Sequence, residues 1–414
     1  MSLTDTTATT RAVSAGIDWS EADHAVCVVD GDGEPIERVT LAHSKAGIAR
    51  LVAVLARHQV LAVGIERPDG PVVDALLAAA LTVYVIAPAQ IKALRRRYGT
   101  AGNKDDRFDA YVLADTVRTD RRRLTPLHRD SQATTALRQL CRARKDLITH
   151  RIAIANQLRA HLAVALPAAI GLFTAIDSIT SRHFLARFTT QEAVDRLTPT
   201  RLTKWLSTIP HNHRSNPEVI YQRISQAPRG ATGAHATALA GITHAYLAAL
   251  TAICDQITAL TDQITHALAA HPDKDIFTSL PKAGTVRAAR LLAEIGDARG
   301  RFPTATALAC LAGVAPSTRE SGKARVVSFR WSADKQLRDA VCDFAGDSHH
   351  ANPWAADLYA KARARGHDHP HAVRILGRAW LDIIWKCWTT NTPYQPDRHR
   401  ALQRLLKQDQ TAGG

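Results

Sequence analysis

The chain has 414 residues, enough for two or three domains that each enclose a hydrophobic core. Lysine and arginine number 53 against 38 acidic residues, and the formal net charge of +15 favours a polyanionic partner such as nucleic acid. The six cysteines have no Cys-x-x-Cys spacing, which excludes a disulfide scaffold and a cysteine zinc site and fits a reducing cytoplasm.

The N-terminal third alternates between strand-like and helical patterns. Residues 1–10 contain no apolar segment of the kind found in signal peptides, and we expect no membrane-spanning segment in the chain. One helix is predicted to begin after Ser44, which is its N-cap, and another to begin at Val72. Strands are predicted at residues 13–19, 24–30, 36–41, 61–66 and 82–87. These elements predict a mixed sheet with helices packed on it, in an α/β domain that ends near Pro126.

Four carboxylates stand at the ends of these predicted elements. Asp18 ends the first strand, Glu66 ends the fourth, and Asp106 and Asp109 lie one turn apart on one face of a predicted helix. If the two strands are neighbours in the sheet, all four acids meet at one patch and bind a hard divalent cation through oxygen ligands. Each acid alone also has a plainer explanation, because acidic residues favour helix starts and polar residues favour strand ends.

Three segments of the sequence resemble the DEDD transposases of the IS110 type. They are Gly16-Ile17-Asp18, the strand that ends in Glu66, and Asn103-Lys104 leading into Asp106-x-x-Asp109. The resemblance implies a RuvC-like domain of the RNase H fold over residues 11–126. It also implies a catalytic, metal-binding tetrad for one or two Mg²⁺ ions, made of Asp18, Glu66, Asp106 and Asp109. Where family members often read Glu-x-Thr-Gly, this chain has one residue more before the glycine, so Asp69 competes with Glu66.

Residues 127–275 are predicted to form a helical and coiled-coil region. Ser131 is the predicted N-cap of a long helix with an apolar stripe, whose other faces carry Arg138, Arg142 and Lys145. We expect these cations, together with Lys104, to contact phosphates, and a plain surface position explains any one of them equally well. A second long helix has the 3-4-3-4 spacing of a coiled-coil seam, and it pairs either with the first helix or with a second copy of the chain. The seam residues are Leu250, Ile253, Ile257, Leu260 and Ile264.

Residues 276–392 are predicted to form a helical domain, and a tail follows at 393–414, of which we expect 408–414 to be disordered. Lys282 precedes a helix start, where backbone N–H groups suit a phosphate, although the same residues suit an ordinary helix start. Ser321 lies beside a glycine in a basic segment with Lys323 and Arg325, a pattern typical of a turn that contacts nucleic-acid phosphates. The histidines of 366–371 and His211-Asn212-His213 are interpreted as loops.

The segment from Gly313 to Gly322 resembles the second motif of the same transposases, in which the serine of Ser-Gly is the nucleophile. The resemblance implies that Ser321 attacks DNA, with Ser317 as its rival, and that strands are cut and rejoined through a serine ester. It further implies two nucleic-acid partners, which are double-stranded DNA at the element ends and target sites and a structured noncoding guide RNA. It also implies that the protein forms a homo-oligomer, either a dimer or a tetramer. The expected location is the bacterial cytoplasm, at the nucleoid.

Two other functions also fit the residues. The first is a RuvC-like, structure-specific endonuclease for Holliday junctions that uses water as its nucleophile. The second is a non-catalytic nucleic-acid-binding scaffold with an inactive RNase H fold. A Ser321→Ala variant separates the endonuclease from a transposase, because hydrolysis by water does not need the serine. An Asp106→Asn variant tested with Mg²⁺ separates the scaffold from both enzymes. The substitution abolishes DNA cleavage by an enzyme, whereas a scaffold cleaves no DNA with or without it.

Overall fold

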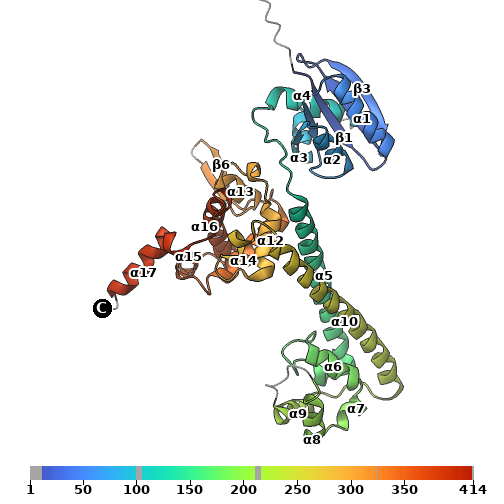
Figure 1. Ribbon diagram of the computed structural model, residues 1–414. Helices are drawn as coiled ribbons and strands as arrows, with labels where there is room; N and C mark the ends of the chain where they lie inside the picture. Colours follow the sequence, from blue (N-terminus) through green and yellow to red (C-terminus); the bar gives the residue numbers. More distant parts are fainter. Residues whose placement is uncertain (1–11, 99–104, 210–215, 323, 413–414) are drawn as a thin grey trace, which may run out of the picture. The chain divides into compact units, whose positions relative to one another are not determined.

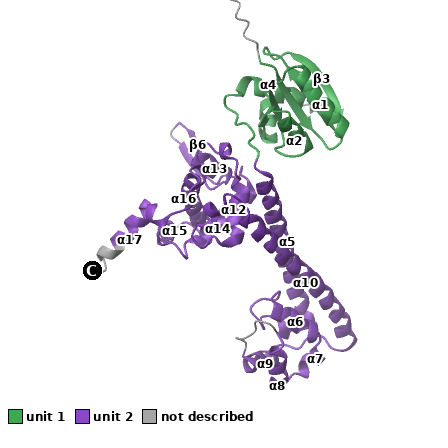
Figure 2. Cartoon of the chain, viewed as in Figure 1, with its two compact units in different colours: residues 1–129 green, residues 130–414 purple. Residues whose placement is uncertain are grey.

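A computed structural model of the protein describes residues 12–98, 105–209, 216–322 and 324–412 (Figure 1). The chain forms two compact units, residues 1–129 and residues 130–414 (Figure 2). The first unit is an α/β domain, and the described part of the second is helical apart from one short two-stranded hairpin. The predicted fold class, an α/β domain followed by a mostly helical remainder, is therefore confirmed.

The first unit is built on a five-stranded sheet with the order β3-β2-β1-β4-β5. Strand β2 runs antiparallel to β1 and β3, whereas β4 runs parallel to β1 and β5. This order and these directions are those of the RNase H-like fold expected from the sequence. The elements are β1 (Ser14–Trp19), β2 (Asp23–Val29), β3 (Pro35–Ala42), α1 (Lys45–Arg57), β4 (Ala62–Ile65), α2 (Pro71–Ala78), β5 (Thr82–Val85), α3 (Pro88–Arg95) and α4 (Asp106–Asp120).

The two faces of this sheet are covered differently. Ala15 and Ile17 of β1 pack into a core with α1 and α2, because alternate side chains of a strand point to the same face. The other face carries Gly16, which is paired with Gly64 of β4. A Cβ atom added to Gly16 would stand 2.1 Å from the Ala110 carbonyl oxygen, and one added to Gly64 would stand 2.9 Å from that of Leu113. The two glycines therefore let the backbone of α4 lie directly on the sheet.

The second unit is organised around two long helices, α5 (Gln132–Ala165) and α10 (Gly233–Ala269). Leu137 near the start of α5 shares a core with Leu268 near the end of α10, and Leu158 near the end of α5 shares another with Leu247. The two helices are therefore antiparallel, with a separate core at each end of the pair (Figure 1).

Shorter helices complete the two cores. The core that contains Leu158 also takes in a 3₁₀ turn (Pro167–Ala169), α6 (Ile179–Arg187), α7 (Gln191–Asp195), α8 (Pro199–Leu206) and α9 (Pro217–Gln226). The core that contains Leu137 takes in α11 (Lys274–Thr278), α12 (Gly284–Ile295), α13 (Ala305–Leu311), α14 (Lys335–Ser348), α15 (Pro353–Ala364) and α16 (His369–Thr389). The remaining elements are 3₁₀ turns at Arg299–Arg301 and Pro396–Arg398, the hairpin of β6 (Ser317–Ser321) and β7 (Ala324–Ser328), and α17 (Arg400–Ala412).

The seam predicted on the second long helix packs within the chain. Leu250, Ile257 and Ile264 are buried, and α10 packs along α5, so the first of the two predicted pairings is present. By length and composition alone, α10 is long and apolar enough to cross a membrane, so the expectation that no segment spans one stays a prediction. Only 17% of its most apolar window is buried. Length and composition alone do not place the helix in a membrane, because the core helix of a water-soluble protein meets the same test.

The C-terminal region is mostly helical as predicted but also contains a hairpin, and the expectation of disorder at its end is wrong for residues 408–412. The region predicted as helical contains the β6–β7 hairpin, whose tip is reached through Gly322 in the left-handed region at φ +55°. Residues 408–412, predicted to be disordered, belong to α17, and Leu402 of this helix is buried. The predicted boundary at 275/276 stays a prediction. His211-Asn212-His213 lies outside the described residues.

Candidate active site

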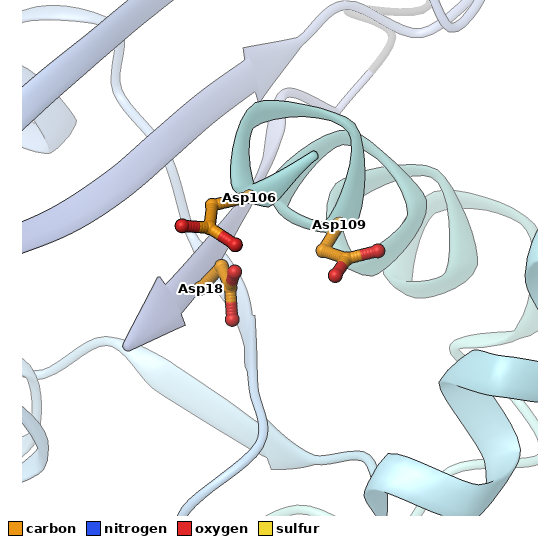
Figure 3. Close-up of side chains that lie close together, drawn as sticks. All are labelled: Asp18, Asp106 and Asp109. Atoms are coloured by element: carbon orange, nitrogen blue, oxygen red, sulfur yellow. The ribbon is translucent and has the colours of Figure 1, made fainter. Parts of the chain in front are cut away.

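Three of the four predicted acids come together at the start of α4. One carboxylate oxygen from each of Asp18, Asp106 and Asp109 lies within 4.8 Å of the other two (Figure 3). Asp18 comes from the end of β1, and the other two come from the first turn of α4. Asp106 is exposed, Asp18 is half-buried, and Asp109 is 1% exposed. The group therefore runs from solvent to the interior of the unit.

The close contact between β1 and α4 explains this convergence. Gly16 faces the helix at Ala110, and Asp18, two residues further along the strand, shares that face. Asp109 directly precedes Ala110, and Asp106 lies one turn earlier. The side chain of Asp105 caps the helix by accepting a hydrogen bond from the Arg107 N–H at 3.1 Å. The position at which α4 begins is thus fixed beside the end of β1.

Glu66 lies beside this group without joining it. Ile65 of β4 is paired with Ile17 of β1, so Glu66 follows in the position next to Asp18 on the neighbouring parallel strand. Its side chain is half-buried, but its carboxylate is not one of the three that approach one another. Its rival Asp69 is exposed and forms an ion pair with Arg67 at 3.0 Å. The adjacency of the two strands supports Glu66 over Asp69 as the fourth acid.

Arg95 at the end of α3 is a residue whose role the sequence did not reveal. Its Nε and one terminal nitrogen donate hydrogen bonds to the two carboxylate oxygens of Asp109. The Asp109 side chain is 2% exposed, and that of Arg95 is 27% exposed. The guanidinium therefore balances the most buried negative charge of the group.

The donor set fits a hard divalent cation. Carboxylate oxygens are the ligands that Mg²⁺ prefers, and three of them close together repel one another unless positive charge lies between or beside them. Arg95 supplies one such charge at Asp109 and leaves the exposed side of the group, at Asp106, open to solvent. Asp18, Asp106 and Asp109 are the residues that would hold the ion, with Glu66 next to them.

The predicted nucleophile lies in the second unit, on the β6–β7 hairpin, which projects from the surrounding helices (Figure 1). Ser321 is paired with Ala324 at the tip of the hairpin, and Ser317 is paired with Ser328 at its base. Ser321 is exposed, and its rival Ser317 is half-buried. Four residues of extended strand span about 13 Å, so the two serines lie well apart along the hairpin.

The cations predicted to contact nucleic acid divide into two groups. Those on α5 form ion pairs within the chain: Arg138 with Asp130, Arg142 with Glu294 at 2.7 Å, and Lys145 with Asp339 at 3.0 Å. Lys282, in the left-handed region at φ +60°, and Arg325 on β7 are both exposed. Lys104 and Lys323 lie outside the described residues.

Comparisons with known proteins agree with the resemblance seen in the sequence. Residues 15–167 match a DEDD family of the IS110 type that is described as a transposase, and residues 274–360 match the "Transposase IS116/IS110/IS902 family". The chain is 32% identical over 413 residues to the "Mini-circle putative transposase for IS117" of Streptomyces coelicolor, covering 95% of this chain and 98% of the relative. It is 28% identical over 404 residues to the IS900 42 kDa protein of Mycobacterium paratuberculosis, covering 93% and 98%.

Among solved structures, Thermus thermophilus RuvC in complex with a Holliday junction substrate matches 28% of this chain and 99% of the RuvC chain. The sequence identity is 20% and the TM-score is 0.23.

Proposed function

The chain belongs to the IS110 family of insertion-sequence transposases, and from that premise we propose that it cuts and rejoins DNA with Ser321 as nucleophile and with Mg²⁺ held by acidic residues. The observation that carries the proposal is the approach of Asp18, Asp106 and Asp109 at the start of α4. Three gathered carboxylates, of which one is buried, are costly to a fold, and a nuclease-like metal site accounts for them.

In the first unit, the acidic residues form the proposed metal site. Asp18, Asp106 and Asp109 would hold the metal, and Glu66, in the next position on the neighbouring strand, would be the fourth acid of the site. A bound Mg²⁺ supplies Lewis-acid stabilisation of the negative charge that develops on the phosphodiester oxygens. Arg95 holds the Asp109 carboxylate in its orientation from the buried side through two hydrogen bonds.

In the second unit, the Ser321 hydroxyl attacks phosphorus. A bond forms between Ser321 Oγ and phosphorus, and the bond between phosphorus and one ester oxygen of the DNA breaks. The serine proton passes to solvent, and the leaving oxygen takes up a proton to become a hydroxyl. The serine phosphodiester keeps the energy of the broken linkage, so attack by another DNA hydroxyl rejoins strands and releases the serine without a high-energy cofactor.

The partners we propose follow from charge and family. The formal charge of +15 suits double-stranded DNA at the element ends and at the target, and a structured noncoding RNA that guides the choice of sites. The two sites lie in different compact units, and we propose a homo-oligomer, a dimer or a tetramer, that works in the bacterial cytoplasm at the nucleoid. Residues 11–126, 127–275, 276–392 and 393–414 are the proposed functional segments.

A cleavage assay tests the metal site. The full chain is incubated with Mg²⁺ and with DNA that carries the flanks of its own gene as candidate element ends. Asp106→Asn is expected to abolish cleavage, whereas Asp120→Asn, at the other end of α4, is expected to preserve it. Equal cleavage by both variants, or cleavage that persists in EDTA, contradicts the proposal.

The same assay addresses the endonuclease alternative. A Ser321→Ala variant that still cuts DNA with Mg²⁺ is a hydrolase and not the proposed transposase. If the parent chain and every variant fail to cut any DNA while they still bind it, the scaffold is the better description.

A further inference from the structure

A positively charged cavity lies at the base of the hairpin that carries Ser321. Its volume is about 380 Å³, and it is enclosed by the loop Gly313–Pro316, by the end of β7 with Phe329 and Arg330, and by the first turns of α16. Arg330, Arg374, Arg378 and His371 line it, and no acidic residue does among the described residues. A neighbouring cavity, which Arg374 also lines, differs because it contains Asp343 and Asp347, and there Arg287 is paired with Asp347 at 2.8 Å.

Two arginines of this cavity, Arg330 and Arg374, are held in place by uncharged groups. Arg330 donates hydrogen bonds to the carbonyl oxygens of Ala315 at 3.2 Å and Pro316 at 3.1 Å. The Arg374 guanidinium lies 4.9 Å from the centre of the Phe329 ring, which also contacts Arg338 at 4.6 Å. In the described part of the chain, neither Arg374 nor Arg378 has a carboxylate within 4.0 Å. Such a site attracts an anion.

The surroundings of the cavity fit a nucleic-acid strand better than a small anion. Trp331, two residues after Phe329, is 83% exposed, and Val326 and Val327 on β7 are 57% and 58% exposed. An exposed indole beside arginines is the combination that binds single nucleic-acid strands, because bases stack on the ring and phosphates meet the cations. Arginine also matches a phosphate with two parallel hydrogen bonds.

We propose that Arg330, Arg374 and Arg378 bind a backbone phosphate of the DNA strand that Ser321 attacks, with a base stacked on Trp331. The inference rests on the proposed function and deepens it. The cavity adjoins the base of the hairpin, near Ser317, and Ser321 lies about 13 Å further along. The bound phosphate is therefore a few nucleotides from the one attacked. Arg374 and Arg378 are positioning residues, which fix the strand and do not touch the reacting phosphorus.

Salt dependence of DNA binding tests this assignment. Full-length Arg374→Gln/Arg378→Gln is compared with Arg187→Gln/Arg223→Gln, which removes the same charge from exposed positions at the other core of the second unit. Binding of a labelled single-stranded DNA is measured by anisotropy over a series of salt concentrations. The cavity variant is expected to bind about ten-fold more weakly. The slope of log K against log salt is negative, and its magnitude is expected to decrease by about 0.7 for each phosphate that the protein no longer neutralises.

Further variants separate positioning from chemistry. Arg374→Lys/Arg378→Lys is expected to restore the salt slope, because it restores the charge. Trp331→Ala is expected to weaken binding about five-fold or more without changing the slope, because stacking releases no counterions. In cleavage, Arg374→Gln/Arg378→Gln is expected to raise KM and leave kcat near that of the parent chain.

Failure of this inference is distinguishable from failure of the proposed function. A salt slope for the cavity variant equal to that of the parent overturns the inference, as does a loss seen only with an RNA probe or an equal loss in the control variant. Ser321→Ala is expected to bind the DNA with the parent affinity and slope. If it also still cuts, the proposed function fails while the phosphate site stands.

Discussion

An Arg95→Ala variant tests the role of Asp109, the buried member of the cluster of three acids, most directly. The substitution removes both hydrogen bonds to Asp109, whose side chain is 2% exposed, and leaves that charge without its cation. Removing one partner of a buried ion pair costs about 3–5 kcal/mol. Because the Arg95 side chain is 27% exposed and therefore partly screened, we expect a loss of roughly 2–4 kcal/mol in EDTA.

Magnesium is expected to return most of this loss. An ion held by Asp109 replaces the guanidinium as the balancing charge, and at a concentration one hundred times its Kd it adds about 2.7 kcal/mol of stability. In the parent chain Arg95 competes with the ion for Asp109, so the variant is expected to bind Mg²⁺ more tightly and to gain more stability from it than the parent does.

Calorimetry with and without Mg²⁺ measures both effects on the first unit. A loss of 2–4 kcal/mol corresponds to a fall in Tm of roughly 8–16 °C for a unit of this size. Arg97→Ala is the control, because its guanidinium is exposed and lies 4.0 Å from Asp120, far from the group along α4. An Arg95→Ala chain as stable as the parent in EDTA, or one that gains less from Mg²⁺ than the parent does, refutes the reasoning.

Three other predictions concern the framework around the two sites. Gly16→Ala is expected to lower the free energy of unfolding in urea by about 1–3 kcal/mol and to weaken Mg²⁺ binding. The new Cβ would stand 2.1 Å from the Ala110 carbonyl oxygen and displace α4. An unchanged free energy of unfolding and an unchanged Mg²⁺ affinity contradict this. Arg142→Ala is expected to destabilise the second unit, because it leaves the buried Glu294 unpaired. The slope of log K against log salt for DNA binding is expected to stay unchanged, and a shallower slope identifies a phosphate contact instead. Burial raises the pKa of Cys141 to about 12, so iodoacetamide at pH 8 is expected to label half-buried cysteines such as Cys254 first and to reach Cys141 only after unfolding, as mass spectrometry would detect.

Much of the first unit could be predicted because its signals are local. Strands β1 to β5 follow apolar runs bounded by turn residues, and the side chains of Ser44 and Ser131 cap α1 and α5 as expected. The adjacency of Asp18 and Glu66 depended on the sheet order, which an α/β pattern favours without fixing. Gly16 and Gly64 mark the contact with α4 in the sequence itself, since glycine inside a strand often indicates close approach of another backbone.

The rest depended on partners that are distant in sequence. The cations of α5 resemble a phosphate-binding face until folding brings Glu294 and Asp339 to them. The β6–β7 hairpin has no buried face, so its residues show no alternation between apolar and polar that would reveal strands. Arg374 and Arg378 are four residues apart on α16, a spacing that places them on one side of the helix, but only the fold brings them to the hairpin.

Covalent trapping tests the central claim most directly. The full chain is incubated with Mg²⁺ and DNA carrying the candidate element ends, then denatured, digested and analysed by mass spectrometry for peptides that carry a nucleotide. The account predicts an adduct on the peptide that contains Ser321, its loss in Ser321→Ala, and its loss in Asp106→Asn. Cleaved DNA with no adduct, or an adduct that maps to Ser317 and persists in Ser321→Ala, contradicts the account.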